Sequence, residues 1–296
     1  MAKIVDYGVF ADRMKRAGGR WDLLREFQEE WGYAPPPIAD DEDHELLLAR
    51  AASNGHKAYV QELMNVDEDD REGVDPSVSI PAALGEWWTL PFNSFVHNPG
   101  FYGSNPEFPP TMRPDPSGYG VADGLQEGSD LLPADADRRL VAFMAENQYC
   151  NEWGYLAAEA HLDDPRVLVT FEDEESDEDG QVWMVQAPSL SRFFLQFTAV
   201  CLPMTLGWSA WLDGDGDEAD RLRASLAPLG FEHPWRELDA ETHLYGGPDV
   251  LVYDMHGGDG NFDVVGRNRE ALEALGRRFG LDWDARLKEP SHRVSA

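Results

Sequence analysis

Four short apolar runs between residues 139 and 186 constrain the fold of this chain more than any other feature. The runs are RLVAFMAE, EWGYLAA, RVLVTF and QVWMVQ, and turn-forming residues separate them. Runs of this length and composition are typical of strands, and short turns between them favour antiparallel pairing. The next stretch, SLSRFFLQFTAVCLPM, predicts a helix capped by Ser189 with one apolar face: Leu190, Phe193, Phe194, Phe197, Cys201 and Met204. We therefore expect an antiparallel meander backed by an apolar helix.

The segments on either side of this meander predict further helices and one hairpin. Apolar residues recur at helical spacing over 21–32, 44–64, 81–88, 217–230 and 268–280. The runs DVLVYDM and NFDVVGR flank HGGDG, which predicts a hairpin. Strands do not alternate regularly with helices, so we expect an α+β fold: a mostly antiparallel sheet backed by helices, with N-terminal helices and a C-terminal helix-hairpin-helix unit.

Proline-rich stretches suggest where this chain divides. The segment YAPPPIADDED reads as a stiff linker, and residues 96–130 are dense in proline and glycine, which predicts a long loop. We expect an N-terminal helical region at 1–74, a sheet domain at 75–206 and an α/β extension at 207–296. The sequence leaves open whether the extension packs on the same domain or stands apart.

The charge of the chain is strongly negative. Asp and Glu number 56 against 24 Lys and Arg, for a formal net charge of −32. Such a field repels nucleic-acid phosphates and anionic lipid and speeds encounter with a basic partner, so we expect no nucleic-acid or membrane binding. Acidity that serves solubility or high-salt adaptation is the alternative. The N-terminus lacks a signal-peptide core and no stretch approaches 18 apolar residues, so we expect a cytoplasmic protein.

Several common enzyme signatures are missing from the sequence. No Gly-Lys-Ser/Thr, His-Glu-x-x-His, Gly-x-Ser-x-Gly or Gly-x-Gly-x-x-Gly motif occurs. The spacing of Asp213, Asp215 and Asp217 is that of a calcium loop, but Glu218 and Ala224 stand where the loop needs glycine and glutamate. The residues His243, Asp249, Asp254, His256 and Asp259 are close in sequence, yet strand alternation separates Asp249 from Asp254. We expect no metal and no cofactor.

The stretch FMAENQYCNEWGYLAA gathers polar residues around one cysteine, between two predicted strands. Glu146 and Glu152 could form an acid pair in an enzyme, but no matched nucleophile or base is suggested. A binding or structural turn is the simpler interpretation. We assign partner binding to Glu146, Asn147, Gln148 and Trp153, and to the acidic segment made of Glu172, Asp173, Glu174, Glu175, Asp177, Glu178 and Asp179.

The order of these motifs resembles the SUKH superfamily, the Smi/Knr-like proteins, over residues 75–206. That family has a Pro-Leu-aromatic lead helix, a strand-turn-strand with an amide and a tryptophan, an Asp-Pro before the next strand, and a Ser-Leu-x-x-Phe-Leu helix. The matching positions are Pro81, Leu84 and Trp88; Glu146, Asn147, Gln148 and Trp153; Asp164, Pro165 and Val167; Ser189, Leu190, Phe193 and Leu195.

This resemblance implies an α+β fold, no catalysis and often a role as an immunity protein that neutralises a polymorphic toxin, frequently a nuclease. A basic nuclease face and an acidic binder are complementary in charge. Two other readings stay open. One is a metal- or carboxylate-dependent hydrolase with its cleft beneath the 96–130 loop, and the other is a regulatory scaffold without a toxin partner.

Overall fold

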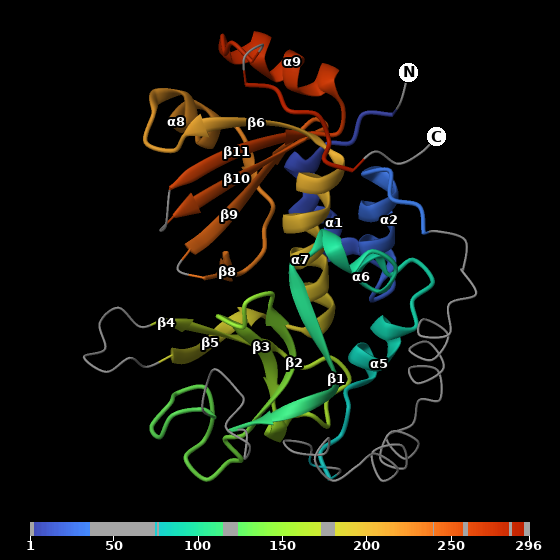
Figure 1. The fold of residues 1–296 in the computed structure, drawn as a ribbon, viewed down its shortest axis with the longest axis vertical. Coiled ribbons are helices and arrows are strands. Elements are labelled where there is room, and N and C mark those ends of the chain that lie inside the picture. The colour runs from blue at the N-terminus through green and yellow to red at the C-terminus, as the bar shows by residue number, and fades with distance from the viewer. Residues whose placement is uncertain are drawn as a thin grey trace. The chain divides into compact units, whose positions relative to one another are not determined.

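The chain folds into two compact units (Figure 1). The computed structural model describes residues 3–35, 75, 77–114, 124–172, 181–238, 240–256, 260–283 and 286–292. The central unit comprises residues 35–193, and the terminal unit comprises residues 1–34 together with 194–296. Each unit combines helices with an antiparallel sheet, which confirms the predicted α+β class.

The central unit contains a five-stranded antiparallel sheet. Its strands are β1 Ser104–Arg113, β2 Leu140–Glu146, β3 Glu152–Leu156, β4 Val167–Glu172 and β5 Gln181–Ala187, in the order β1-β2-β3-β4-β5. Every neighbouring pair along the chain is also a neighbouring pair in the sheet, as Figure 1 shows. The meander predicted from the four apolar runs is therefore present.

The structure adds a strand where the sequence predicted only a long loop. Helix α6 Ser94–His97, the 3-10 turn η3 Pro99–Phe101 and strand β1 all lie within 96–130 or at its start. The expectation of a continuous loop is therefore wrong. Strand β1 lies at the edge of the sheet, and its register with β2 slips between Pro106 and Thr111. Prolines are tolerated at such edges and bulges, where no ladder donor is needed.

Aromatic side chains fill the core of the central unit. Helix α5 Ala82–Trp88 begins after Pro81, its N-cap, and buries Leu84, Trp87 and Trp88 as predicted. A second group lies on the sheet, where the ring of Phe193 is 5.4 Å from Phe143 and 6.0 Å from Trp153, centroid to centroid. Edge-to-face and tilted ring pairs of this kind stabilise a core beyond simple burial of area.

The apolar helix is α7 Leu190–Leu206, and two side chains fix its start. The Ser189 hydroxyl accepts from Arg192 N–H (3.3 Å), as predicted for a cap. The Asp164 carboxylate accepts from Ser191 N–H (3.0 Å) and from its hydroxyl (2.6 Å). Acceptors at a helix start satisfy donors that have no partner within the helix. The predicted apolar face is buried at its phenylalanines, but Met204 in the last turn is exposed.

The terminal unit contains a second antiparallel sheet. Its order is β6-β11-β10-β9-β7, and β8 also pairs with β9. The strands are β6 Trp208–Asp213, β7 Ala227–Pro228, β8 Trp235–Glu237, β9 Ala240–Gly247, β10 Val250–His256 and β11 Asn261–Gly266. The sequence analysis anticipated the β10 and β11 runs but none of the other strands.

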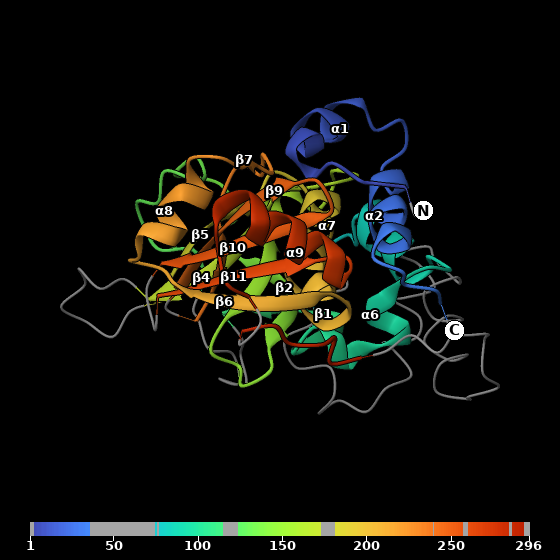
Figure 2. The same cartoon turned by 90° about the horizontal axis from the view of Figure 1, so that it is seen from above.

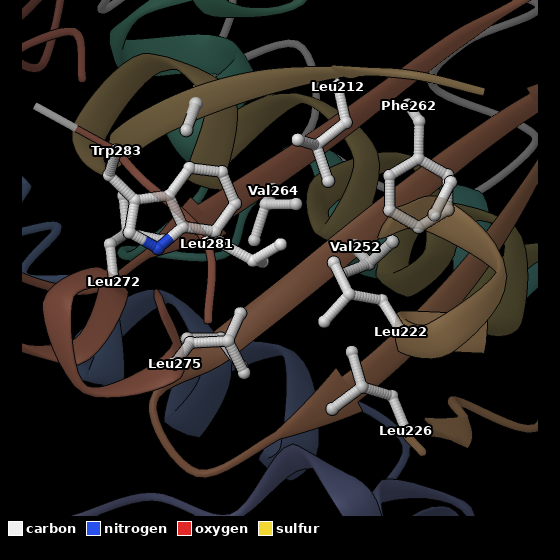
Figure 3. Packing of buried hydrophobic residues seen from close by; sticks show 13 residues of the cluster. Leu212, Leu222, Leu226, Val252, Phe262, Val264, Leu272, Leu275, Leu281 and Trp283 are labelled. Atoms are coloured by element: carbon white, nitrogen blue, oxygen red, sulfur yellow. The ribbon is translucent and has the colours of Figure 1, made fainter. Parts of the chain in front are cut away.

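Helices α8 Asp217–Arg223 and α9 Arg269–Phe279 cover one face of this sheet, which Figure 2 shows from above. Figure 3 shows the hydrophobic cluster between these helices and the sheet. Leu222 and Leu272 from the helices pack there with Val252, Phe262 and Val264 from the strands. On the opposite face, the Tyr253 hydroxyl donates to Ala199 O of α7 (2.7 Å). The central strand β10 is therefore buried on both faces from Val250 to Asp254.

The N-terminal segment belongs to the terminal unit. It forms the 3-10 turn η1 Tyr7–Val9 and helices α1 Phe10–Arg16 and α2 Asp22–Glu30. Asp6 forms an isolated antiparallel β-bridge with Pro248. Arg267 donates hydrogen bonds to Glu30 O (2.6 Å) and to the Asp249 carboxylate (2.6 Å). The domain boundaries expected at 74 and 206 thus do not coincide with the boundaries of the two units. Contacts between residues more than 200 positions apart leave no pattern in the local sequence from which such a boundary could be predicted.

Two further expectations concern parts of the chain outside the description. The helix predicted at 44–64 and most of the predicted linker at 33–43 lie among residues that the structure does not describe.

Within the described ranges, no helix has both the length and the apolar character needed to cross a membrane.

Candidate functional site

The turn between β2 and β3 is built around the carboxylate of Glu146. Glu146 is 7 % exposed, and its carboxylate accepts from Gln148 N–H (2.7 Å) and Cys150 N–H (3.4 Å). Tyr149 lies at the tip with φ of 61°, a backbone conformation that costs energy for a non-glycine residue. Glu146 is therefore placed as the acceptor that holds this turn together.

The other carboxylate of the stretch is also engaged. Glu152 is 1 % exposed and accepts from Arg113 Nε (2.9 Å to Oε2), while Arg113 Nη2 also contacts Glu107 (3.3 Å). A buried arginine and carboxylate that satisfy each other cost much less than either charge alone. Glu146 and Glu152 therefore serve separate structural roles, so the structure does not combine them into an acid pair.

Trp153 lies in the core of the central unit. Its side chain is 0 % exposed and packs against Phe193, so its indole is not presented to a partner. Of the residues assigned to this turn, Asn147 and Gln148 are exposed, together with Tyr149 and Cys150. Asn147 is held by its N–H to Gly103 O (3.0 Å), and its carbonyl accepts from Asn105 (3.3 Å).

The acidic segment assigned to partner binding lies almost wholly outside the described residues. Glu172 ends β4, but its side chain and the residues from Asp173 to Asp179 are not described. Because β5 begins at Gln181, the acidic segment connects two paired strands in the sequence. The structure therefore neither joins these carboxylates to the Glu146 turn nor separates them from it.

The terminal unit brings together ionisable side chains that the sequence analysis considered and set aside. The antiparallel register places His243 opposite Asp254, and the rings of His243 and His256 are 5.1 Å apart. His256 Nε2 lies 3.3 Å from Asp254 Oδ2, and Arg223 donates to both oxygens of Asp254 (2.7 and 2.6 Å). Asp249 takes no part, since it binds Arg267 at the β9–β10 turn.

Asp254 is 1 % exposed, and its ionisation is controlled by these neighbours. Burial opposes its charged form, but hydrogen bonds and charge from Arg223, together with His256, hold the pKa of Asp254 below its usual value. An ionised carboxylate beside an exposed imidazole can orient that ring as a proton acceptor. Among the described residues, no three His, Cys, Asp or Glu side chains form a group that could hold a metal ion.

The remaining candidates have structural explanations. The Asp213–Glu218 stretch forms the turn into α8, where Asp213 accepts from Asp215 N–H (3.2 Å). Cys150 is exposed, whereas burial raises the pKa of the Cys201 thiol well above its usual value, so that thiol stays protonated.

A hollow of about 620 Å³ lies beside the N-terminal segment of the terminal unit. Arg13 in its wall pairs with Glu26 and Glu30, and Arg267 pairs with Asp249. The two arginines of this wall are therefore already neutralised by carboxylates.

The comparisons add no identity to this geometry. No protein-family model, curated protein or solved structure matches the chain.

The sequence analysis did not identify Trp211 as an exposed aromatic residue. Trp211 is 48 % exposed on β6, where its indole Nε1 donates to Asn261 Oδ1 (3.0 Å). The sequence shows a tryptophan two residues before an acidic turn, but it does not show that this side chain is exposed. Only the strand register shows which side chains surround it.

Proposed function

We propose that this chain is a non-enzymatic protein-binding module for a basic partner, and that it acts as a SUKH-type immunity protein against a polymorphic toxin. The observation that carries the proposal is the distribution of charge. Many arginines in the described part of the chain are paired with carboxylates, although Arg221 binds backbone carbonyls and Arg278 lies over the Phe279 ring. Because 56 acidic residues face 24 basic ones, such pairing leaves a large excess of negative charge. A surface of this kind attracts a basic protein and repels nucleic acid.

The ion pairs occur in both units. In the central unit Arg139 contacts Asp75 (2.6 Å) and Asp137 (2.8 Å). In the terminal unit Arg269 contacts Glu273 (2.8 Å), and Arg286 contacts Glu218 (2.7 Å). Meanwhile carboxylates such as Glu127, Asp130 and Asp215 are exposed. Each of these ion pairs is close to neutral as a whole, so the field outside the protein comes from the carboxylates that have no cationic partner.

The motif resemblance supports the immunity role within this binding class. Asp164 and the helix motif that begins at Ser189 meet at the start of α7, so two separate parts of the motif series form one local structure. A nuclease toxin must hold phosphates and therefore presents a basic face. Occluding that face by complementary charge gives fast association, while apolar anchors set how long the complex lasts.

The test is direct binding to candidate toxin domains from the reading frames that flank this gene, measured at increasing salt. We expect tight binding whose association rate falls steeply as salt rises, because screening weakens long-range attraction. Replacement of one exposed carboxylate, as in Glu127→Gln, should leave the complex intact because the field is shared. Lack of binding, or affinity that does not change with salt, would refute the charge-based proposal.

The His256–Asp254 pair favours a second candidate function, acid–base hydrolysis. An exposed imidazole held by a buried carboxylate is one half of a general-base arrangement. A screen of ester and phosphodiester substrates, with and without divalent metals, tests this alternative. Turnover that His256→Gln abolishes and Glu146→Gln leaves unchanged would establish hydrolysis at the terminal unit in place of binding.

A further inference from the structure

Strand β6 is an edge strand that already pairs with a short segment of its own chain. It has β11 on one side, and on the other side Ser209 exchanges two backbone hydrogen bonds with Lys288 (3.0 and 2.8 Å). In an antiparallel ladder, outward-facing backbone groups belong to alternate residues. The N–H and C=O of Trp211 therefore face the same outer side as those of Ser209.

This self-pairing stops before it reaches Trp211. The chain turns at Arg286 and Leu287, whose N–H groups both donate to Trp283 O (2.7 and 2.9 Å). The ladder formed by Lys288 therefore does not continue along β6, and no backbone partner for Trp211 on this outer edge occurs in the described ranges. An unpaired edge of this kind is a template for another strand.

The side chain of Trp211 is presented in one orientation on this edge. It is 48 % exposed, and the hydrogen bond from Nε1 to Asn261 Oδ1 (3.0 Å) fixes the indole across the neighbouring strand. Rigid, half-exposed tryptophans are frequent energetic anchors of protein interfaces. Trp211 therefore offers an aromatic face without further ordering of its side chain.

A carboxylate lies directly beside this indole. Asp263 pairs with Trp211 in the β6–β11 register, so both side chains project on the same face of the sheet. Burial raises the pKa of Asp263, an effect that the charge of Lys288 partly offsets. The Asp263 carboxylate has no hydrogen-bond partner among the residues that the structure describes. A half-buried carboxylate in this situation is stabilised by an incoming cation.

The strand ends in a group of acidic residues. Asp213, Asp215 and Asp217 follow Trp211 along the chain and are all exposed. Their charge adds to that of Asp263 at the same end of β6. A basic segment approaching this edge would be attracted along its length, whereas an acidic segment would be repelled.

We propose that the outer edge of β6 at Trp211 docks an extended, arginine- or lysine-bearing segment of a protein partner as an added strand. The residue opposite Trp211 in such a strand projects on the same face as the indole. Its cationic group lies over the ring and binds the Asp263 carboxylate. Backbone pairing supplies affinity, and the Trp211–Asp263 pair selects a cation at that position. The inference rests on the proposed function in taking a basic protein as the partner.

The probe is a fluorescein-labelled peptide that alternates arginine with threonine and valine, titrated with the full chain while anisotropy is recorded. We expect Trp211→Ala to weaken binding about tenfold and Asp263→Asn to weaken it several-fold. The same peptide N-methylated at alternate residues should not bind, because methyl groups block strand pairing. Trp211→Phe, which keeps an apolar ring, should lie between the wild type and Trp211→Ala. Circular dichroism confirms that each variant is folded.

Matched controls separate this edge from the rest of the surface. Tyr149→Ala removes an aromatic side chain that is 52 % exposed, and Glu127→Gln removes one exposed charge; both should leave peptide affinity unchanged. Weakening by Tyr149→Ala with none by Trp211→Ala would overturn the proposal and place the contact at the β2–β3 turn. A concentration-dependent dimer that Trp211→Ala abolishes would overturn it in favour of a second copy of this chain.

Failure of this inference can be told apart from failure of the proposed function. If a candidate toxin domain binds the wild type and Trp211→Ala equally, the binding function stands and this edge is not its contact. If the toxin domain does not bind but the arginine peptide binds in a Trp211-dependent way, the edge stands and the immunity role is refuted.

Discussion

Replacing Trp153 by alanine should destabilise the central unit by about 4 kcal/mol. The side chain is 0 % exposed, and its ring lies 6.0 Å from that of Phe193. A buried tryptophan removes about 200 Å² from water, which at about 25 cal/mol per Å² corresponds to about 5 kcal/mol. The retained methyl group and partial collapse of the cavity reduce this value. Since domains are stable by about 5–15 kcal/mol, the variant loses a large fraction of its stability.

Urea unfolding followed by far-ultraviolet circular dichroism measures this loss. Trp153→Phe keeps a ring in the same space and should lose less than half as much. Trp211→Ala is the matched control, because about half of that side chain is already exposed and its removal should cost about 2 kcal/mol. A loss of less than about 1 kcal/mol in Trp153→Ala would refute the reasoning from burial.

The same variant also tests what Trp153 is for. Because the indole has no exposed surface, Trp153→Ala protein that remains folded should bind a partner as the wild type does. If folded Trp153→Ala binds more weakly while its sheet is intact, the assignment of Trp153 to partner binding from the sequence would be correct after all.

Three further outcomes follow from the described contacts. Asp164→Ala removes the acceptor of Ser191 at the start of α7 and should cost about 1 kcal/mol in urea unfolding, whereas Asp163→Ala, next to it and exposed, should cost almost nothing. Hydrogen bonds from Ser77 and Arg139 lower the pKa of Asp75 to about 2. The contribution of Asp75 to the free energy of unfolding is therefore complete above the unfolded pKa of about 3.9 and is lost as pH falls to about 2. Asp75→Asn should remove that part of the pH dependence, which is less than about 1 kcal/mol for so exposed an ion pair. Burial raises the pKa of Asp263, which lowers stability as pH rises from the unfolded pKa through the folded one, so Asp263→Asn should raise the melting temperature at pH 7 and have no effect at pH 3.

The central meander could be predicted because its information is local. Each run from 139 to 186 carries its own apolar residues and its own turn, and neighbours in the chain are neighbours in the sheet. The lead helix at Pro81 and the cap at Ser189 are likewise set by residues within one helical turn. Such features depend on spacing and backbone chemistry, which a sequence displays directly.

Strand β1 and the sheet of the terminal unit could not be predicted in this way. The prolines in β1 point away from strand structure, and only its position at the sheet edge makes them acceptable. Strand β9 carries His243 and Tyr245 among few purely apolar residues, and it is defined by its partners β8 and β10. Pairing between strands distant in sequence decides these elements.

The candidate site shows the same division. The sequence placed Glu146 and Trp153 together as polar and aromatic surface, but burial made one a turn acceptor and the other a core residue. No pattern indicated that Trp211 would stay half-exposed beside Asp263, since that depends on the register of β6 with β11 and on where α7 covers the sheet. The exposure of a side chain is therefore decided by the folded structure around it.

The sequence alone therefore determined the α+β class, the central meander, the apolar helix and the strongly acidic character of the protein. Each follows from local spacing or from a simple count of charges, which folding does not change. Only the tertiary structure decided that the first 34 residues join the last hundred, and which aromatic and acidic side chains face solvent. Those properties arise from contacts between residues far apart in the chain, where one side chain removes another from water.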